Sequence, residues 1–116
     1  FGAKDIKGLK VMTATLGEAD VSELRRMGDF LRDKEENVVA VLSSVREGKI
    51  TFLCVCGKRA IARGVKAGAI IKEVTAIAGG SGGGKPDSAM GGGKDLLKLD
   101  DALAVVDDIV DRAVTE

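Results

Sequence analysis

The stretch GGSGGGKPDSAMGGGK, residues 79–94, is the feature around which we interpret the rest of the chain. It contains eight of the sixteen glycines and the single proline, Pro86. Glycine lets the backbone approach another surface closely and adopt positive φ, because it has no Cβ. A dense glycine run leaves peptide N–H groups free to converge on an anion, and Lys85 and Lys94 add positive charge. The stretch therefore predicts an exposed, anion-binding loop.

A flexible linker is the alternative interpretation, since linkers are also rich in glycine. Two features disfavour it. Pro, Asp and Met occur in the stretch in non-repeating order, and strongly apolar helical patterns lie on both sides of it. We therefore expect the loop to belong to a folded domain.

Length and composition predict one α/β domain with an aliphatic core. The chain has 116 residues, of which 45% are hydrophobic and only 3% aromatic, enough for a single core but not for two. The net charge is zero, yet residues 58–94 carry seven bases against two acids, a net charge of +5. Residues 95–116 carry two bases against seven acids, a net charge of −5. The middle of the chain thus offers a basic patch and its end an acidic helix.

Residue types that are rare or absent limit the chemistry. The sequence has no histidine, the commonest general base and metal ligand. Cys54 and Cys56 alternate along an apparent strand, which favours buried small hydrophobic residues over a disulfide framework or a zinc site. No signal peptide or 18-residue apolar run occurs, so we expect a cytoplasmic protein without membrane contact. The chain does not begin with Met, and we interpret residues 1–7 as a linker remnant before a domain of residues 8–116.

The first half of the chain reads as a strand, a helix and two strands. The strands are expected at residues 9–16, 38–45 and 50–56, where apolar and β-branched residues dominate. Asp20, with Glu23 three residues on, resembles a capping box that begins the helix. Together they predict a βαβ unit followed by a hairpin.

The second half reads as two helices around the glycine stretch. Residues 57–64 have too mixed a pattern to assign, residues 67–78 predict a helix ending at a glycine cap, and residues 99–113 carry a clean apolar stripe. The expected fold is a small mixed β-sheet with helices packed on it. The glycine-rich loop between the last two helices should lie exposed at one edge.

Two motifs suggest chemistry that the rest of the sequence disfavours. GGSGGGK satisfies the spacing of a nucleotide-binding phosphate loop, but such a loop follows a strand and continues with Ser or Thr, whereas Pro86 comes next here. Asp107, Asp108 and Asp111 suggest a metal cluster, but they lie opposite the apolar stripe of the last helix, where solvated side chains are expected. We expect neither catalysis, nor a cofactor, nor a metal in this chain. Two interpretations of the lysines remain. They form a phosphate-contacting surface together with loop amides, or they are ordinary surface lysines.

The run KAGAIIKEVTAIAGGSGGGKPDSAMGGGKDLLKLDDAL, which ends at Leu103, resembles the C-terminal domain of alanyl-tRNA synthetase. That family typically shows HAGxLIKE, then GGGGGGRPDMAQAGGKD and a helix opening KLDEAL. The ordered glycines, Pro-Asp and Lys-Asp all align, over about a third of the chain. Lys66 stands where the family usually has His, Ser88 where it has Met and Met90 where it has Gln. The earlier strands fit in pattern only.

The resemblance implies a non-catalytic tRNA-binding domain of an alanine–tRNA ligase. In that family the domain binds the elbow of tRNA(Ala), helps to couple aminoacylation with editing, and can contribute to self-association. ATP and zinc would belong to other domains of the parent protein. The residues expected to contact nucleic acid are Lys66, Lys72, Gly82, Gly83, Gly84, Lys85, Pro86, Asp87 and Lys94.

Three other interpretations stay open. The same DHH-associated domain type also ends RecJ-like nucleases and oligoribonucleases, where the glycines lead into a histidine that touches the nucleic acid. Lys85 at that place favours the synthetase, or the similar free-standing alanyl-tRNA editing proteins. A purely structural oligomerisation module is the remaining alternative.

Overall fold

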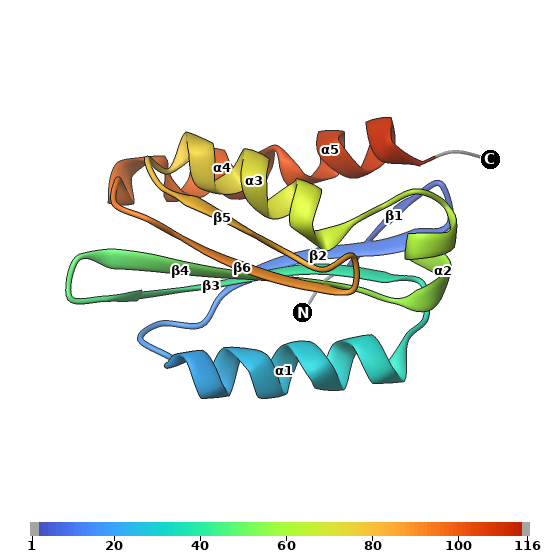
Figure 1. Cartoon of the computed structure of the whole chain (residues 1–116), viewed down its shortest axis with the longest axis horizontal. Helices are drawn as coiled ribbons and strands as arrows, with labels where there is room; N and C mark the ends of the chain where they lie inside the picture. The colour runs from blue at the N-terminus through green and yellow to red at the C-terminus, as the bar shows by residue number, and fades with distance from the viewer. Residues whose placement is uncertain (1–2, 115–116) are drawn as a thin grey trace.

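A computed structural model describes residues 3–114 as one six-stranded sheet with helices on both faces (Figure 1). The strands are β1 (Lys4–Ile6), β2 (Leu9–Thr15), β3 (Val38–Arg46), β4 (Lys49–Cys56), β5 (Ser81–Gly84) and β6 (Ser88–Gly93). The helices are α1 (Val21–Lys34), α2 (Lys58–Ala62), α3 (Ala67–Ile77), the 3₁₀ turn η1 (Leu96–Lys98), α4 (Leu99–Ala104) and α5 (Val106–Ala113). The spatial order is β1-β2-β3-β4-β6-β5, with β2 and β3 parallel and every other pair antiparallel. The predicted α/β fold with a mixed sheet is confirmed.

The β2-α1-β3 unit forms as its sequence predicts. The carboxylate of Asp20 accepts a hydrogen bond from the amide of Glu23, and the Glu23 side chain accepts one from the amide of Asp20. This reciprocal capping box satisfies two amides that the first helical turn would otherwise leave open. Leu24 and Gly28 lie on the buried face of α1, four residues apart, as helical geometry requires. The helix therefore returns the chain to pair β3 in parallel with β2.

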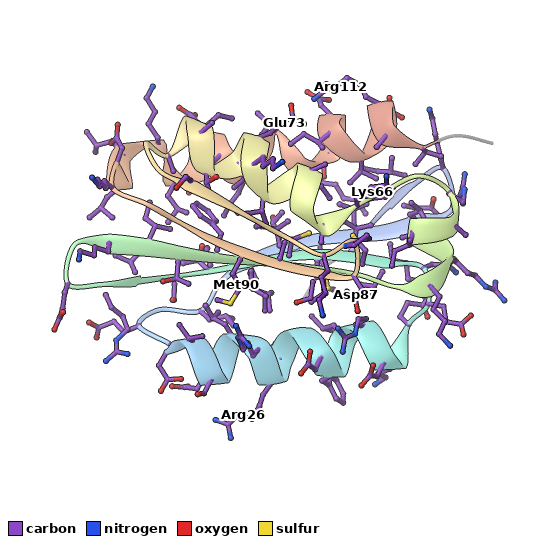
Figure 2. All side chains as sticks on the ribbon, in the orientation of Figure 1. Arg26, Lys66, Glu73, Asp87, Met90 and Arg112 are labelled. Atoms are coloured by element: carbon purple, nitrogen blue, oxygen red, sulfur yellow. The ribbon has the colours of Figure 1, made fainter. Side chains whose placement is uncertain are left out.

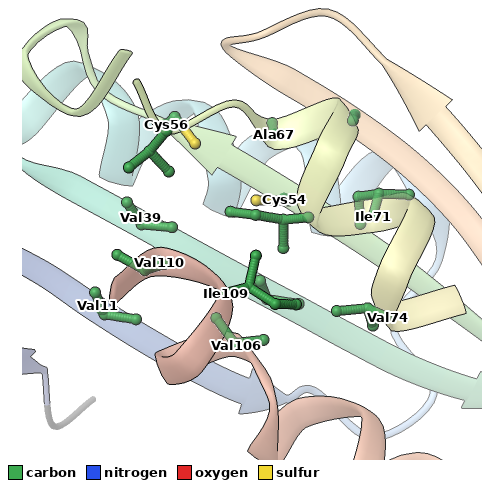
Figure 3. Packing of buried hydrophobic residues seen from close by; sticks show 14 of the residues in the cluster. Val11, Val39, Cys54, Cys56, Ala67, Ile71, Val74, Val106, Ile109 and Val110 are labelled. Atoms are coloured by element: carbon green, nitrogen blue, oxygen red, sulfur yellow. The ribbon is translucent and has the colours of Figure 1, made fainter. Parts of the chain in front are cut away.

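Both faces of β3 and β4 are covered by helices, which explains why these two strands are continuous apolar runs. On one face α1 packs against alternate residues of β3 and β4: Val38, Ala40, Leu42, Leu53 and Val55. On the other face α3, α4 and α5 cover a larger core that includes Val39, Cys54 and Cys56 (Figure 3). Both cysteines are free and fully buried, as predicted.

The expected glycine-rich loop is wrong: residues 81–84 and 88–93 are strands β5 and β6, a hairpin that extends the sheet beyond β4. The predicted position at one edge is right, because β5 is the edge strand of the sheet, beyond β6. The glycines are needed for close packing. A Cβ on Gly82 would lie 2.5 Å from the Gly91 Cα, and one on Gly91 would lie 2.6 Å from Thr75 Cγ2 of α3. Without side chains, two strands and a helix can approach more closely than usual.

The ends of the chain also differ from expectation. Residues 4–6, assigned to a linker remnant, form β1 and pair with β2, while Phe1 and Gly2 lie outside the described residues. The last helix is interrupted at Val105, which separates α4 from α5. The unassigned residues 57–64 contain the short helix α2. Within residues 3–114, no helix is long and apolar enough to cross a membrane.

Candidate nucleic-acid interface

The turn that joins β5 to β6 is fixed by backbone hydrogen bonds to two other elements. The amide of Lys85 donates to the carbonyl of Ser88 across the turn (3.0 Å). The Pro86 carbonyl accepts from the amide of Ala67 in the first turn of α3 (2.9 Å), and the Asp87 carbonyl accepts from the amide of Cys56 at the end of β4 (3.1 Å). The turn therefore sits in a defined place beside the start of α3.

Two predicted lysines on α3 lie beside this turn. Lys66 is the residue at which α3 begins, and Lys72 lies on the same helix. Together with Gly84 and Pro86 they line a cavity of about 250 Å³. The Ala67–Pro86 hydrogen bond accounts for this proximity, because it holds the beginning of the helix against the turn. The structure thus brings four of the nine predicted residues together.

Lys85 and Asp87 line a second hollow, on the face of the sheet that carries α1. We call it the α1–hairpin groove; it has a volume of about 410 Å³. Its lining residues are Arg25, Asp29 and Arg32 of α1, and Gly83, Gly84, Lys85, Asp87, Ser88, Ala89 and Met90 of the hairpin. Figure 2 shows Met90 and Asp87 on the side of the sheet that faces α1. Gly84 lines both hollows, so the turn separates two adjoining basic surfaces.

Lys94 is the predicted residue that the structure does not bring to the turn. It follows β6 directly and lines a different hollow, of about 390 Å³, with Lys49 and Thr51 of β4. The hairpin turn lies at the opposite end of β6, and the seven residue steps from Asp87 to Lys94 span about 23 Å at a rise of about 3.3 Å per residue. Lys94 therefore belongs with Lys49 and not with Lys66, Lys72 and Lys85.

The glycine amides of residues 82–84 do not converge on an anion-binding site as the sequence predicted. Gly82, Gly83 and Gly84 are extended and paired with β6, opposite Gly91, Met90 and Ala89. Successive peptide groups of a strand point to alternate sides, so they do not converge on one point as they would in a nest. At Gly83 an added Cβ would have only Lys72 Cε nearby, at 3.7 Å, so this strand position stays open to an approaching ligand.

Four cations around the turn have no ion pair or side-chain hydrogen bond within residues 3–114, and we call them the basic turn region: Arg25, Lys66, Lys72 and Lys85. The acidic end of the chain is different. Asp107 lies 2.8 Å from the Lys4 ammonium, and Asp111 lies 3.4 Å from that of Lys7. The first contact raises the pKa of Lys4, chiefly through its hydrogen bond to Asp107. Positive charge therefore stays uncompensated beside the hairpin turn, while part of the acidic charge is neutralised internally.

Arg25 and Arg32 are the two cations of the groove that the sequence did not reveal. They lie on α1, where Arg32 is 55 positions from Asp87 of the hairpin turn, and nothing in their spacing indicates that β6 will lie beside β4. The sequence does place Arg25 next to the buried Leu24. A helical apolar pattern alone, however, does not show which strand or turn lies beside Arg25 in the folded chain.

A model of the DHHA1 domain matches residues 8–112 of the chain. The chain is 47% identical to the alanine–tRNA ligase of Dehalococcoides mccartyi over 104 residues, which is 90% of the chain and 12% of that relative. It is 44% identical to the alanine–tRNA ligase of Acetivibrio thermocellus over 101 residues, which is 87% of the chain and again 12% of the relative. The chain thus spans about an eighth of the length of these curated relatives.

One solved structure shows the same architecture. The crystal structure of the C-Ala domain from Aquifex aeolicus alanyl-tRNA synthetase superimposes with a TM-score of 0.87 at 29% identity. The match covers 96% of this chain and 99% of the other. Both comparisons agree with the family that the glycine motif and its flanking helices resemble.

Proposed function

The chain belongs to the DHHA1 domain family, and from this premise we propose that it is the tRNA-binding C-terminal domain of an alanine–tRNA ligase. The observation that carries the proposal is the basic turn region, four uncompensated cations around one turn in a chain of zero net charge. Lysine and arginine bind nucleic acid mainly by neutralising phosphates. The relatives named above, all of them alanine–tRNA ligases, make tRNA the nucleic acid to test.

The proposed docking site on the RNA is the elbow of tRNA(Ala). Double-stranded RNA is recognised largely by shape and by phosphate and ribose contacts. The two hollows beside the turn are lined by more cationic than acidic residues, together with glycine, serine and a few apolar residues, and their cations and small residues suit such contacts. In the parent protein the domain would hold one tRNA in reach of both the aminoacylation and the editing centres, in the cytoplasm. ATP and zinc would be bound by other domains, and the domain would also contribute to self-association.

A salt titration tests the proposal. Binding of a tRNA(Ala) transcript to the chain should weaken linearly on a log–log plot between 50 and 200 mM salt. The slope should be about −3 if three to four cations contact phosphates, at about −0.7 to −0.9 per contact. Binding that does not depend on salt, or no binding at 50 mM, would overturn the proposal.

A charge-matched pair of variants locates the surface. The triple variant Lys66→Gln, Lys72→Gln, Lys85→Gln removes three cations of the basic turn region. The control Arg26→Gln, Lys34→Gln, Arg46→Gln removes three exposed cations from elsewhere. Only the first should lose most of the affinity. A minihelix made of the acceptor stem and T arm, which lacks the elbow, should bind more weakly than the whole tRNA; equal binding would contradict elbow docking.

A further inference from the structure

The face of the sheet that carries α1 is only partly covered by it. The apolar partners of α1 lie on β3 and β4, and of β6 only Met90 packs against this cluster, half-buried. In Figure 1, α1 lies beneath the sheet, and its packing contacts are chiefly with β3 and β4 and not with the β5–β6 hairpin. The α1–hairpin groove fills this uncovered strip.

The floor of the groove suits close approach by a polar backbone. Gly83 and Gly84 present no side chains, and Ser88 is small and carries a hydroxyl. None of the ten lining residues is aromatic, so the groove offers no ring on which a base would stack. This chemistry favours contacts with phosphate and ribose over contacts with bases.

The charged residues of the groove divide into a cluster around Arg32 and two cations outside it. Arg32 lies 3.2 Å from Asp29, 3.6 Å from Asp33 and 3.5 Å from Asp87. One guanidinium is thus shared among three carboxylates and does not neutralise them all, and the lining residues of the groove, three cations against Asp29 and Asp87, carry a net charge of +1. Arg25 and Lys85 lie on opposite sides of the groove, one on α1 and one on the hairpin, and neither forms an ion pair within residues 3–114.

We propose that the α1–hairpin groove holds a stretch of tRNA backbone, with Arg25 and Lys85 on its phosphates. This inference rests on the proposed function and deepens it. It adds Arg25, which lies outside the glycine motif, to the RNA-contacting residues. It assigns Arg32 a positioning role, because its ion pairs join the two walls of the groove.

Arg25 and Arg26 provide a matched test. Both are exposed arginines on α1, but Arg25 lines the groove whereas Arg26 points away from the molecule (Figure 2). Arg25→Gln should weaken binding of a tRNA(Ala) transcript by about tenfold at 50 mM salt, the usual scale for one charge-assisted hydrogen bond. It should also reduce the salt slope by about 1. Arg26→Gln, with the same change in charge, should bind within about twofold of the unmodified chain.

Amide chemical shifts give a second measurement that needs no variant. On addition of tRNA, the amides of Gly83 and Ser88 should shift, while those of Glu47 and Gly48, in the β3–β4 turn, should not. Equal effects of Arg25→Gln and Arg26→Gln, or unshifted groove amides in a chain that binds, would overturn the inference and leave the proposed function intact. Failure of the unmodified chain to bind would overturn both.

Discussion

The guanidinium of Arg32, on α1, lies 3.5 Å from the carboxylate of Asp87, in the turn between β5 and β6. The two residues are 55 positions apart in the sequence. Their contact joins the first helix of the chain to its glycine hairpin across the α1–hairpin groove. It is therefore a direct link between the βαβ unit and the candidate RNA-binding turn.

This ion pair should contribute measurably but modestly to stability. The side chain of Arg32 is 26% exposed and that of Asp87 is 48% exposed, so water screens much of the attraction. A double-mutant cycle with Arg32→Gln and Asp87→Asn should give a coupling of roughly 0.5–1 kcal/mol in urea unfolding. The coupling should shrink at 1 M salt, where the Debye length is about 3 Å. Strictly additive effects would show that the contact does not form in solution.

Substitution by alanine should destabilise the fold at Gly82 but hardly at Gly83, although the two glycines are neighbours on β5. A Cβ on Gly82 would meet Gly91 Cα at 2.5 Å and Ile71 Cγ2 at 2.8 Å, whereas one on Gly83 would meet only Lys72 Cε at 3.7 Å. Gly82→Ala should lower the free energy of unfolding by roughly 1–3 kcal/mol through overpacking. Gly83→Ala should change it by less than about 0.5 kcal/mol. Equal destabilisation in urea melts would mean that the hairpin does not lie against α3 as described.

The double variant Gly83→Ala, Lys85→Ala should impair binding more than folding. It removes one cation and adds a methyl group where the RNA backbone would approach, so tRNA binding should weaken by roughly 1–3 kcal/mol. The melting temperature should change little, because Lys85 is exposed and Gly83 has room for a Cβ. Lys34→Ala, on the solvent side of α1 above the Phe30 ring, is the control for lost charge. Unchanged affinity would mean that the turn only connects β5 to β6 and does not contact tRNA.

The buried thiol of Cys54 should make the fold less stable in mild alkali. Burial raises the pKa of the Cys54 thiol, and the neighbouring Cys56 reinforces the shift. Unfolded thiols ionise near pH 8.5, so above that pH the unfolded chain binds fewer protons than the native one. The free energy of unfolding should therefore fall between about pH 8 and pH 10. The raised pKa of Lys4 acts in the same direction, but only at higher pH, where free lysines titrate.

Urea melts across this range would measure the effect of the thiols. Cys54→Ala should flatten the pH dependence, although it also lowers stability at every pH by leaving a cavity. In the native chain both thiols should react with a thiol reagent only as fast as the core opens, because neither is exposed. Rapid labelling at pH 8 without denaturant, or an unchanged slope in the variant, would contradict this account.

The sequence by itself determined the elements whose signals are local. The capping box at Asp20 and the apolar period of α1 depend on residues three or four positions apart, and the buried strands β3 and β4 are apolar throughout. The order and spacing of the glycines, followed by Pro86 and Asp87, also pointed to the right family. These signals do not depend on how the rest of the chain folds, so they can be recognised from the sequence alone.

Only the tertiary structure decided how the glycine stretch is used. Its residues have no side chains with which to show an apolar period, so nothing local distinguishes a loop from a strand. The stretch becomes two strands because β4 offers an unpaired edge and α3 lies so close that Gly82 and Gly91 leave no room for a Cβ. The same pairing brings the hairpin beside α1 and makes Arg25 part of the groove. Contacts between residues far apart in the sequence thus determined the candidate site.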